Sequence, residues 1–416
     1  MNKFIQNLFQ VVYPFYPLWA WFATSILHFP VEKILIFVLL PILVYIIWVI
    51  RVRVPAYLIF FISFTLYHIG STFYFGLLAS NTKPLFFILS DANVLACILF
   101  LVIENTNFDE GFLRKMNRHI LWIVTLSLLI SIIQMKNPLF FYDTSQDKEL
   151  EYVGDSRIAS IYSWVSLNSI GVTFPILIAI LLNFYSTRSK FFPLVTVSGI
   201  IVAFLTKARF VMISMIIGFL QLLLISSIPL KKKLYIIGFF VVGIFLIIGA
   251  SQMVGYDINA TINERILEKG TDMRSAKARI VSYDVFMMKF PENPYFGVGP
   301  KTRNDVVDLL DGSAPIIHVG YLSYLYYYGA FGASLLFLAL LCLLWDGWIT
   351  GRRNDFWGSF YGLLGFTLAN FTFVYLNFSE MGIILAVIYM RYYKVNPVRL
   401  EGANIKKERK LSYKMA

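Results

Sequence analysis

Three arginines and one histidine stand out because each borders or lies within a segment that interrupts the apolar runs: Arg157, Arg209, Arg279 and His318. Guanidinium groups stay charged and bind phosphate through paired hydrogen bonds, which suits a pyrophosphate leaving group at a membrane surface. Such a leaving group needs charge neutralisation more than protonation, whereas an acceptor sugar hydroxyl needs a base such as histidine. These residue types together indicate glycosyl transfer from a lipid pyrophosphate.

Each of these residues also has a purely structural interpretation. Arg157 and Arg279 are compatible with interfacial side chains that extend their charge toward water. His318 is compatible with a hydrogen-bonded polar residue at a helix start. Tyr321 and Tyr324 are candidates for stacking on sugar rings, but an aromatic belt at the membrane interface explains them as well.

Signatures of metal or nucleotide chemistry are missing from the sequence. It contains no HExxH, Asp-x-Asp, Walker A, Gly-rich dinucleotide or Gly-x-Ser-x-Gly motif. With four histidines and two cysteines, few metal ligands exist, so no metal site and no cofactor are expected. Asp91 is interpreted either as part of a proton path or as the cap of a helix break. The other histidines are interpreted as structural: His28, His68 and His119.

The elements that position these residues are predicted to be membrane-spanning helices. The chain of 416 residues is 58% hydrophobic and 14% charged, with a mean hydropathy of +0.70. Its apolar runs are continuous over about 17 to 25 residues, which is the length of a transmembrane helix. The predicted helices lie near 7–28, 34–50, 56–79, 84–104, 119–134, 159–184, 191–206, 210–228, 234–252, 316–344, 357–376 and 380–393. The first is interpreted as a retained helix and not as a signal peptide.

Basic residues concentrate on alternate connections between these helices. They fall in the connections 51–53, 105–118, 186–190, 229–233 and 346–355 and in the tail from residue 394. The positive-inside rule therefore predicts cytoplasmic N- and C-termini and explains the net charge of +12 without a nucleic-acid partner. The turn 206–209 is the exception, because it places Lys207 and Arg209 on the outer side. Cations there are costly to place, which favours a functional role for Arg209.

Two outer connections are long, one over about 134–157 and one over about 253–315. The second contains a helical pattern from Ser275, a candidate N-cap, up to Pro291. The predicted organisation is therefore helices one to nine in 1–252, a large partly helical periplasmic loop in 253–315, helices ten to twelve in 316–393, and a basic cytoplasmic tail in 394–416. The fold class is an all-α polytopic membrane protein of about twelve transmembrane helices.

The order of motifs in the second half resembles the O-antigen polymerase/ligase family. The motifs are Arg279 followed by Tyr283 and Phe286, then Pro294-Tyr-Phe-Gly297-Val-Gly299, His318-Val-Gly-Tyr-Leu, and Tyr328-Gly-Ala-Phe-Gly332. Two upstream segments are also similar: Arg157 to Asn168-Ser-Ile-Gly171, and Thr206-Lys-Ala-Arg209. The chain departs from the family pattern at Lys207-Ala208, where small residues are more usual, and at the valine after His318.

This resemblance implies a metal-independent glycosyltransferase of the bacterial inner membrane that uses undecaprenyl-pyrophosphate-linked oligosaccharide on the periplasmic face. It implies that Arg209 and Arg279 hold the donor pyrophosphate, that Arg157 binds a phosphate or orients a sugar, and that His318 is the catalytic base. Gly297 and Gly299 are expected to border the substrate. Membrane lipids are expected partners, with a chain-length regulator protein as a further candidate.

Three functions remain open at this point. A repeat-unit polymerase is favoured over an O-antigen ligase that transfers glycan to lipid A core, although both need the same arginines and base. A lipid-linked oligosaccharide flippase or transporter belongs to a different class. It predicts charged helix interiors and short loops, whereas the candidate-site charges here lie near the outer face and one outer loop covers about 253–315.

Overall fold

The computed structural model describes residues 2–27, 31–49, 52–75, 88, 91–137, 140–141, 158, 160–162, 173–185, 190–206, 209–224, 227–254, 274–299, 317, 319–369, 371 and 378–397. In these ranges the protein is 83% helical without a strand, which confirms the all-α prediction. Three of the described helices are long and apolar enough to cross a membrane: Ala56–Tyr74, Glu110–Gln134 and Gly320–Asn354. Shorter apolar helices accompany them, as expected for a membrane protein. The count of twelve spans stays a prediction.

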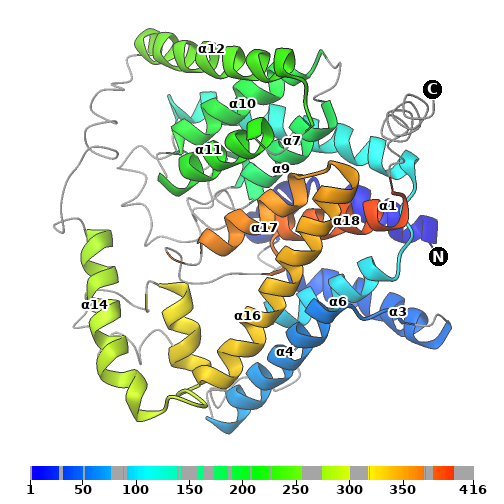
Figure 1. Ribbon diagram of the computed structural model, residues 1–416, viewed down its shortest axis with the longest axis vertical. Coiled ribbons are helices and arrows are strands. Elements are labelled where there is room, and N and C mark those ends of the chain that lie inside the picture. Colours follow the sequence, from blue (N-terminus) through cyan, green and yellow to red (C-terminus); the bar gives the residue numbers. More distant parts are fainter. Residues whose placement is uncertain are drawn as a thin grey trace, which may run out of the picture.

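Figure 1 shows the arrangement of the helices. In chain order they are α1 (Asn2–Val12), α2 (Tyr16–Ser25), α3 (Val31–Val49), α4 (Ala56–Tyr74), α6 (Ala92–Glu104), α7 (Glu110–Gln134), η2 (Ser160–Tyr162), α9 (Phe174–Tyr185), α10 (Phe192–Leu205), α11 (Arg209–Leu224), α12 (Leu230–Val254), α14 (Arg274–Lys289), η5 (Phe290–Glu292), α16 (Gly320–Asn354), α17 (Gly358–Ala369) and α18 (Met381–Val395).

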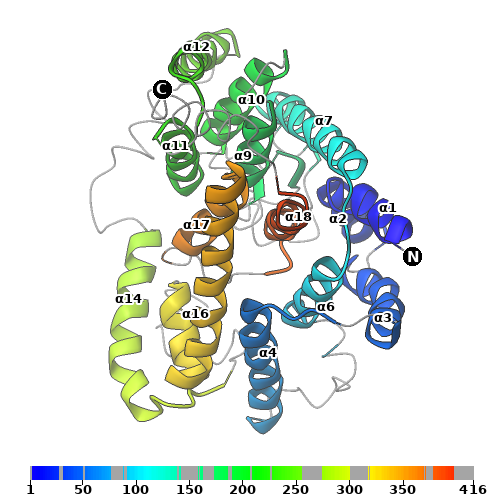
Figure 2. The ribbon, with the colours of Figure 1, turned by 45° about the vertical axis from the view of Figure 1, so that its right-hand side comes forward.

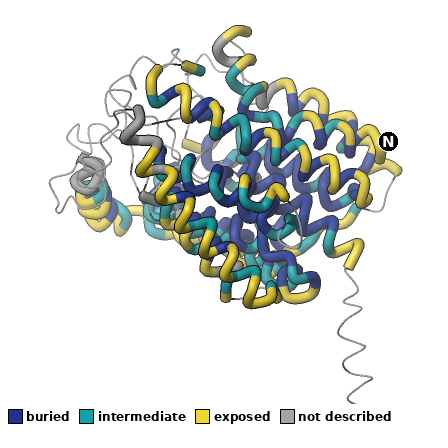
Figure 3. Tube along the Cα trace, turned by 90° about the horizontal axis from the view of Figure 1, so that it is seen from above, coloured by how far each residue is buried: buried dark blue, intermediate teal, exposed yellow. Residues whose placement is uncertain are grey.

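The core of the bundle forms around α18. Every residue from Met381 to Tyr392 is buried, and α18 contacts α6, α9, α16 and α17. Figure 2 shows α18 in the middle of the bundle, with α4 and α16 running side by side. Burial is concentrated inside, while the outer surfaces of the helices are exposed (Figure 3). Those surfaces carry large apolar side chains such as Trp48 and Trp122, which suits helices bordered by lipid.

The first predicted helix differs from the structure. The sequence predicted one helix over 7–28, but α1 and α2 are separate, with turn residues at 13–15. Pro14 and Pro17 explain the interruption, because proline lacks an N–H and its ring clashes with the preceding helical turn. Pro17 is instead accommodated in the first turn of α2. The prediction of one continuous span at the N-terminus is therefore wrong.

Helix caps account for other shifts in the boundaries. α7 begins near 110 and not near 119, because the Asp109 carboxylate accepts a hydrogen bond of 2.6 Å from the Phe112 N–H. α6 begins at Ala92, after Asp91, although a helix from about 84 was predicted. α16 continues to Asn354, beyond the predicted end near 344, and stops where Asp355 adopts a left-handed conformation. The apolar runs therefore identify the helices, and the caps determine the residues at which they begin and end.

Hydrogen bonds gather several connections at one end of the bundle. The Gln6 side chain donates to the Asn107 carbonyl at 2.7 Å. The Arg53 N–H donates to the Asn105 side chain at 2.7 Å, and the Asn396 side chain donates to the Phe108 carbonyl at 3.1 Å. These connections belong to the basic set that the charge rule assigned to one side, so the fold groups them as that rule requires. The side of the membrane that this end faces stays a prediction.

A substitution of buried Tyr57 tests how much the hydrogen bonds at this end contribute to stability. The Tyr57 hydroxyl donates a hydrogen bond of 2.9 Å to the Glu104 carboxyl, and both side chains are buried. We expect Tyr57→Phe to lower the free energy of unfolding by about 1 to 3 kcal/mol, because a buried acceptor loses its donor. Thermal unfolding of the purified protein measures the effect. Tyr74→Phe is the matched control, since Tyr74 lies on the same helix and is 84% exposed. An equal effect of both substitutions would contradict the prediction.

Candidate functional site

A break in α16 is the centre of the candidate site. Gly329 has φ +62° and ψ −176°, so residues 320–328 and 330–354 form two helical parts of one element. In a continuous helix, the N–H groups of Ala330 and Phe331 would bond the carbonyls of Tyr326 and Tyr327. The break separates these donors from these acceptors, and all of them then need new partners.

Residues 294–299, which we term the docked turn, supply those partners. The Ala330 N–H donates to the Pro294 carbonyl at 2.8 Å, and the Phe331 N–H donates to the Tyr295 carbonyl at 3.0 Å. In the other direction, the N–H groups of Val298 and Gly299 donate to the carbonyls of Tyr326 and Tyr327, at 3.2 and 2.8 Å respectively. The docked turn thus replaces two helical hydrogen bonds with four bonds between segments.

Glycine is required at this junction for steric reasons. A Cβ atom at Gly297 would overlap the Tyr327 carbonyl, and one at Gly329 would overlap the Tyr295 carbonyl. Both residues also have positive φ, as does Gly299, whose Cβ would meet the Phe75 ring. Gly297 and Gly299 were predicted to border the substrate; the structure gives their backbone a role in docking the turn.

The docked turn also contacts the end of α4. The Tyr67 hydroxyl donates a hydrogen bond of 2.7 Å to the Phe296 carbonyl. The Tyr67 ring lies edge-on to the Phe331 ring, with 5.5 Å between centroids. The turn is therefore held by α4 as well as by both parts of α16.

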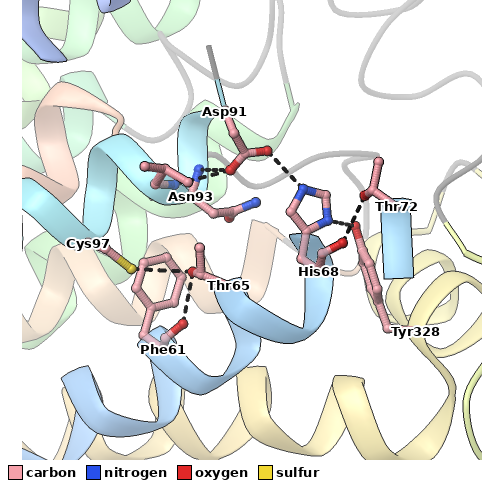
Figure 4. Close-up of polar contacts among 9 residues, drawn as sticks. Phe61, Thr65, His68, Thr72, Asp91, Asn93, Cys97 and Tyr328 are labelled. Atoms are coloured by element: carbon pink, nitrogen blue, oxygen red, sulfur yellow. Dashed lines mark hydrogen bonds and ion pairs between the residues drawn. The ribbon is translucent and has the colours of Figure 1, made fainter. Parts of the chain in front are cut away.

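Beside the break, a buried chain of polar side chains joins three helices (Figure 4). The His68 Nε2 lies 2.8 Å from the Asp91 carboxylate, and the His68 Nδ1 lies 2.8 Å from the Tyr328 hydroxyl. The other Asp91 oxygen accepts from the N–H groups of Asn93 and Val94 and so caps α6. We term Asp91, His68 and Tyr328 the relay. An imidazole between a carboxylate and a hydroxyl is fixed in orientation and in tautomer.

The relay was not identified as a site from the sequence. His68 was interpreted as structural, and for Asp91 a helix cap was one of two interpretations, which the structure confirms. The signal that could have identified it is the presence of two ionisable residues, His68 and Asp91, within predicted apolar helices, since such residues are costly in a membrane and commonly functional. Their pairing needs the three-dimensional packing of α4 against α6.

The predicted loop helix is present as α14, which carries Arg279 and stands beside the first part of α16 (Figure 2). The Arg279 side chain is half-buried. Of the two aromatic residues expected on its face, Phe286 is buried and stacks on Phe290 at 4.7 Å, whereas Tyr283 is exposed.

At the end of α14, Lys289 forms an ion pair of 2.9 Å with Glu292. The hydrogen bond to Glu292 and its charge raise the pKa of the exposed Lys289.

The two tyrosines proposed to stack on sugars are engaged in helix packing. The Tyr321 hydroxyl donates to the Thr367 carbonyl at 2.7 Å, and its ring lies 4.7 Å from the Phe371 ring. The Tyr324 ring stacks on the Tyr328 ring at 6.2 Å. Both are half-buried. These contacts position the first part of α16, and a contact with sugar stays a prediction.

The other predicted site residues fall at the limits of the described structure. Arg209 is the first residue of α11, but its side chain lies outside the described part, as do Arg157 and His318 entirely. Ile317 and Val319, on either side of His318, are described, and Val319 is the N-cap of α16. The described part of the candidate site therefore consists of the docked turn, the start of α16 and α14 with Arg279. The meeting of the arginines with His318 stays a prediction.

The family model described as O-Antigen ligase matches residues 194–337. This segment runs from α10 through α14 and the docked turn to the second part of α16. The match confirms the predicted resemblance to the O-antigen polymerase/ligase family. Members of this family are glycosyltransferase-like enzymes. A search of curated proteins gives no match.

The matched segment separates the site residues into two groups. Arg209, Arg279 and His318 lie inside it, together with Tyr328 of the relay. Arg157 lies outside it, and so do the relay residues His68 and Asp91. The relay therefore connects the matched segment to helices from the first part of the chain.

A substitution at the break tests the docked turn. We expect Gly329→Ala to destabilise the protein by more than about 2 kcal/mol, because its backbone conformation is essentially limited to glycine and the Tyr295 carbonyl occupies the space of the added methyl group. Thermal unfolding measures the loss. Gly238→Ala in α12 is the control, since nothing lies within 4 Å of a Cβ there. Equal unfolding temperatures for the two variants would show that the break does not need glycine.

Proposed function

We propose that this protein polymerises undecaprenyl-pyrophosphate-linked oligosaccharide repeat units into a surface polysaccharide, such as O-antigen, capsule or exopolysaccharide. The reaction is a metal-independent glycosyl transfer on the periplasmic side of the bacterial inner membrane. The observation that carries the proposal is the match over residues 194–337, because the same segment holds Arg209, Arg279, the docked turn and His318.

The arrangement of the two ends of the bundle supports the periplasmic location. α4 starts next to the basic connections, where Arg53 bonds Asn105, and ends at the docked turn, where Phe75 lies against Gly299. At a rise of about 1.5 Å per residue, its 19 residues separate the two ends by about 28 Å. If the basic end faces the cytoplasm, the docked turn lies near the outer face of the membrane.

In the proposed mechanism, the arginines of α11 and α14 neutralise the donor pyrophosphate. Arg209 and Arg279 retain their charge at all relevant pH values and bind phosphate oxygens in pairs, so the leaving group departs without protonation. His318 removes the proton from the acceptor hydroxyl as the new glycosidic bond forms. Arg157 binds a phosphate or orients a sugar. His318 lies in the chain between the docked turn, residues 294–299, and the first part of α16, which are joined to each other by hydrogen bonds.

Two other functions are alternatives to the polymerase. An O-antigen ligase, which transfers glycan to lipid A core, needs the same cations and base and differs only in its acceptor. A lipid-linked oligosaccharide flippase does not need a base beside a set of arginines.

A chain-length regulator protein is a further proposed partner for the polymerase. The tail 394–416 is expected on the cytoplasmic side.

Loss of Arg279 or His318 tests the reaction directly. We expect Arg279→Ala and His318→Ala each to reduce polymer formation by about 100-fold or more, because one removes charge stabilisation and the other removes the base. The assay uses purified protein and lipid-linked oligosaccharide, with products separated by length. Arg352→Ala is the control, since this exposed arginine lies at the other end of the bundle. Full activity in both test variants would refute the assignment.

A deletion of the gene distinguishes polymerase from ligase. For a polymerase, we expect a single repeat unit on the acceptor, because transfer continues while chain growth stops. For a ligase, we expect acceptor without any repeat unit and accumulation of lipid-linked polymer. Electrophoresis of the surface glycan separates these outcomes, and the second pattern would replace the polymerase proposal by the ligase alternative.

A further inference from the structure

We infer that His68 and Asp91 are positioning residues for the transfer reaction, and that they act through Tyr328 by holding the docked turn against the break in α16. The inference rests on the proposed function, because it assigns a task within that reaction. It concerns residues outside the segment that matches the family. Neither residue is placed in contact with substrate, so their effect is indirect.

The first observation is that His68 and Asp91 form a largely buried ionisable pair. The His68 and Asp91 side chains are 9% and 11% exposed, and they lie 2.8 Å apart. Removing a carboxylate from water costs several kcal/mol unless hydrogen bonds replace the lost solvent. Asp91 receives such bonds from His68 and from the N–H groups of Asn93 and Val94. The buried carboxylate therefore has hydrogen-bond donors on both oxygens, so the contact between His68 and Asp91 is not incidental.

The position of Tyr328 is the second observation. Tyr328 directly precedes Gly329 and follows Tyr326 and Tyr327, whose carbonyls accept the hydrogen bonds of the docked turn. Its hydroxyl is held by His68 at 2.8 Å, and its ring packs edge-on against Phe64 of α4 at 5.2 Å. Fixing this side chain fixes the orientation of the peptide groups on which the turn docks.

The third observation is the connectivity of the docked turn. It directly follows α14 and η5 in the chain. Its position therefore constrains the position in space of the C-terminal end of α14, the helix that carries Arg279. The residues after it lead to His318 and the start of α16. Transfer rates respond strongly to such placement, since a shift of about 1 Å in a reacting group can cost about 100-fold. A loosened turn is therefore expected to lower turnover more than donor binding.

The test compares variants that break the relay with variants that preserve it. Tyr328→Phe removes only the hydroxyl, and Asp91→Ala removes the carboxylate. Asp91→Asn removes the charge but keeps both hydrogen bonds of His68. The amide oxygen still caps α6, and the amide N–H donates to the His68 Nε2. The imidazole then changes tautomer and donates through Nδ1 to the Tyr328 hydroxyl. Tyr389→Phe is the matched control, because its buried hydroxyl bonds Asn117 at 2.8 Å, away from the relay.

Two measurements are made on the full-length protein. Hydrogen–deuterium exchange followed by mass spectrometry reports the amides of Val298 and Gly299 in the docked turn, which are protected by their hydrogen bonds to the Tyr326 and Tyr327 carbonyls of α16. Steady-state transfer with lipid-linked oligosaccharide gives kcat and KM. For Tyr328→Phe and Asp91→Ala we expect exchange in 294–299 to accelerate by about threefold to tenfold, as for the loss of one buried hydrogen bond. We expect kcat to fall by about tenfold or more with KM within about twofold.

Asp91→Asn and Tyr389→Phe are expected to match the wild-type protein in exchange of the turn and, within about threefold, in kcat. Unchanged exchange of 294–299 in Tyr328→Phe and Asp91→Ala would overturn the inference. Faster exchange of the turn in Tyr389→Phe would also overturn it, because the effect would then be general loosening. An Asp91→Asn variant as inactive as Asp91→Ala would show that the reaction depends on the charge of Asp91 and would overturn its role as a positioning residue. A wild-type protein without transfer activity would refute the proposed function, and the exchange arm alone would then decide whether the relay holds the turn.

Discussion

The exchange of backbone hydrogen bonds between the docked turn and the break in α16 is the constraint on which the site depends. An unpaired N–H or C=O costs several kcal/mol where water is absent, so a broken helix among apolar helices needs other partners. Residues 294–299 provide them through four bonds of 2.8 to 3.2 Å. The turn in its place and the break at Gly329 therefore require each other. Only glycine permits the close approach at this crossing.

This constraint links parts of the chain that would otherwise be independent. The turn ties the C-terminal end of α14 to the first part of α16, which follows His318 in the chain. Arg279 lies on the same helix, ten residues before that end. On its other side it lies against α4 through Tyr67 and Phe75. A long loop that was recognised by its length alone is thereby held at a definite place on the bundle. Catalytic groups on long loops need such support to be placed accurately.

The two ends of α4 show how polar groups divide their tasks in this bundle. At one end, Tyr57 and Glu104 form a buried hydrogen bond next to the connections that join α1, α6 and α18. At the other end, His68 joins Asp91 to Tyr328 beside the break. The first set holds helices together where no site residue is predicted. The second lies next to the docked turn, which gives it influence on the placement of the site.

The sequence alone determined the all-α class, most of the helices, the helix within the long loop and the family resemblance, because apolar length, loop length and motif order are local properties of the chain. The apolar runs did not place the split at Pro14 or the helix starts after Asp91 and Asp109, because prolines and caps act within one helical turn and can interrupt or extend a run. The role of His68 could not be predicted, because its partners Asp91 and Tyr328 lie 23 and 260 positions away in the chain. Gly297 and Gly299 were recognised as a motif and assigned to substrate. Only the tertiary structure revealed that their backbone occupies the break in α16, because that pairing joins residues about thirty positions apart whose side chains carry no sign of it.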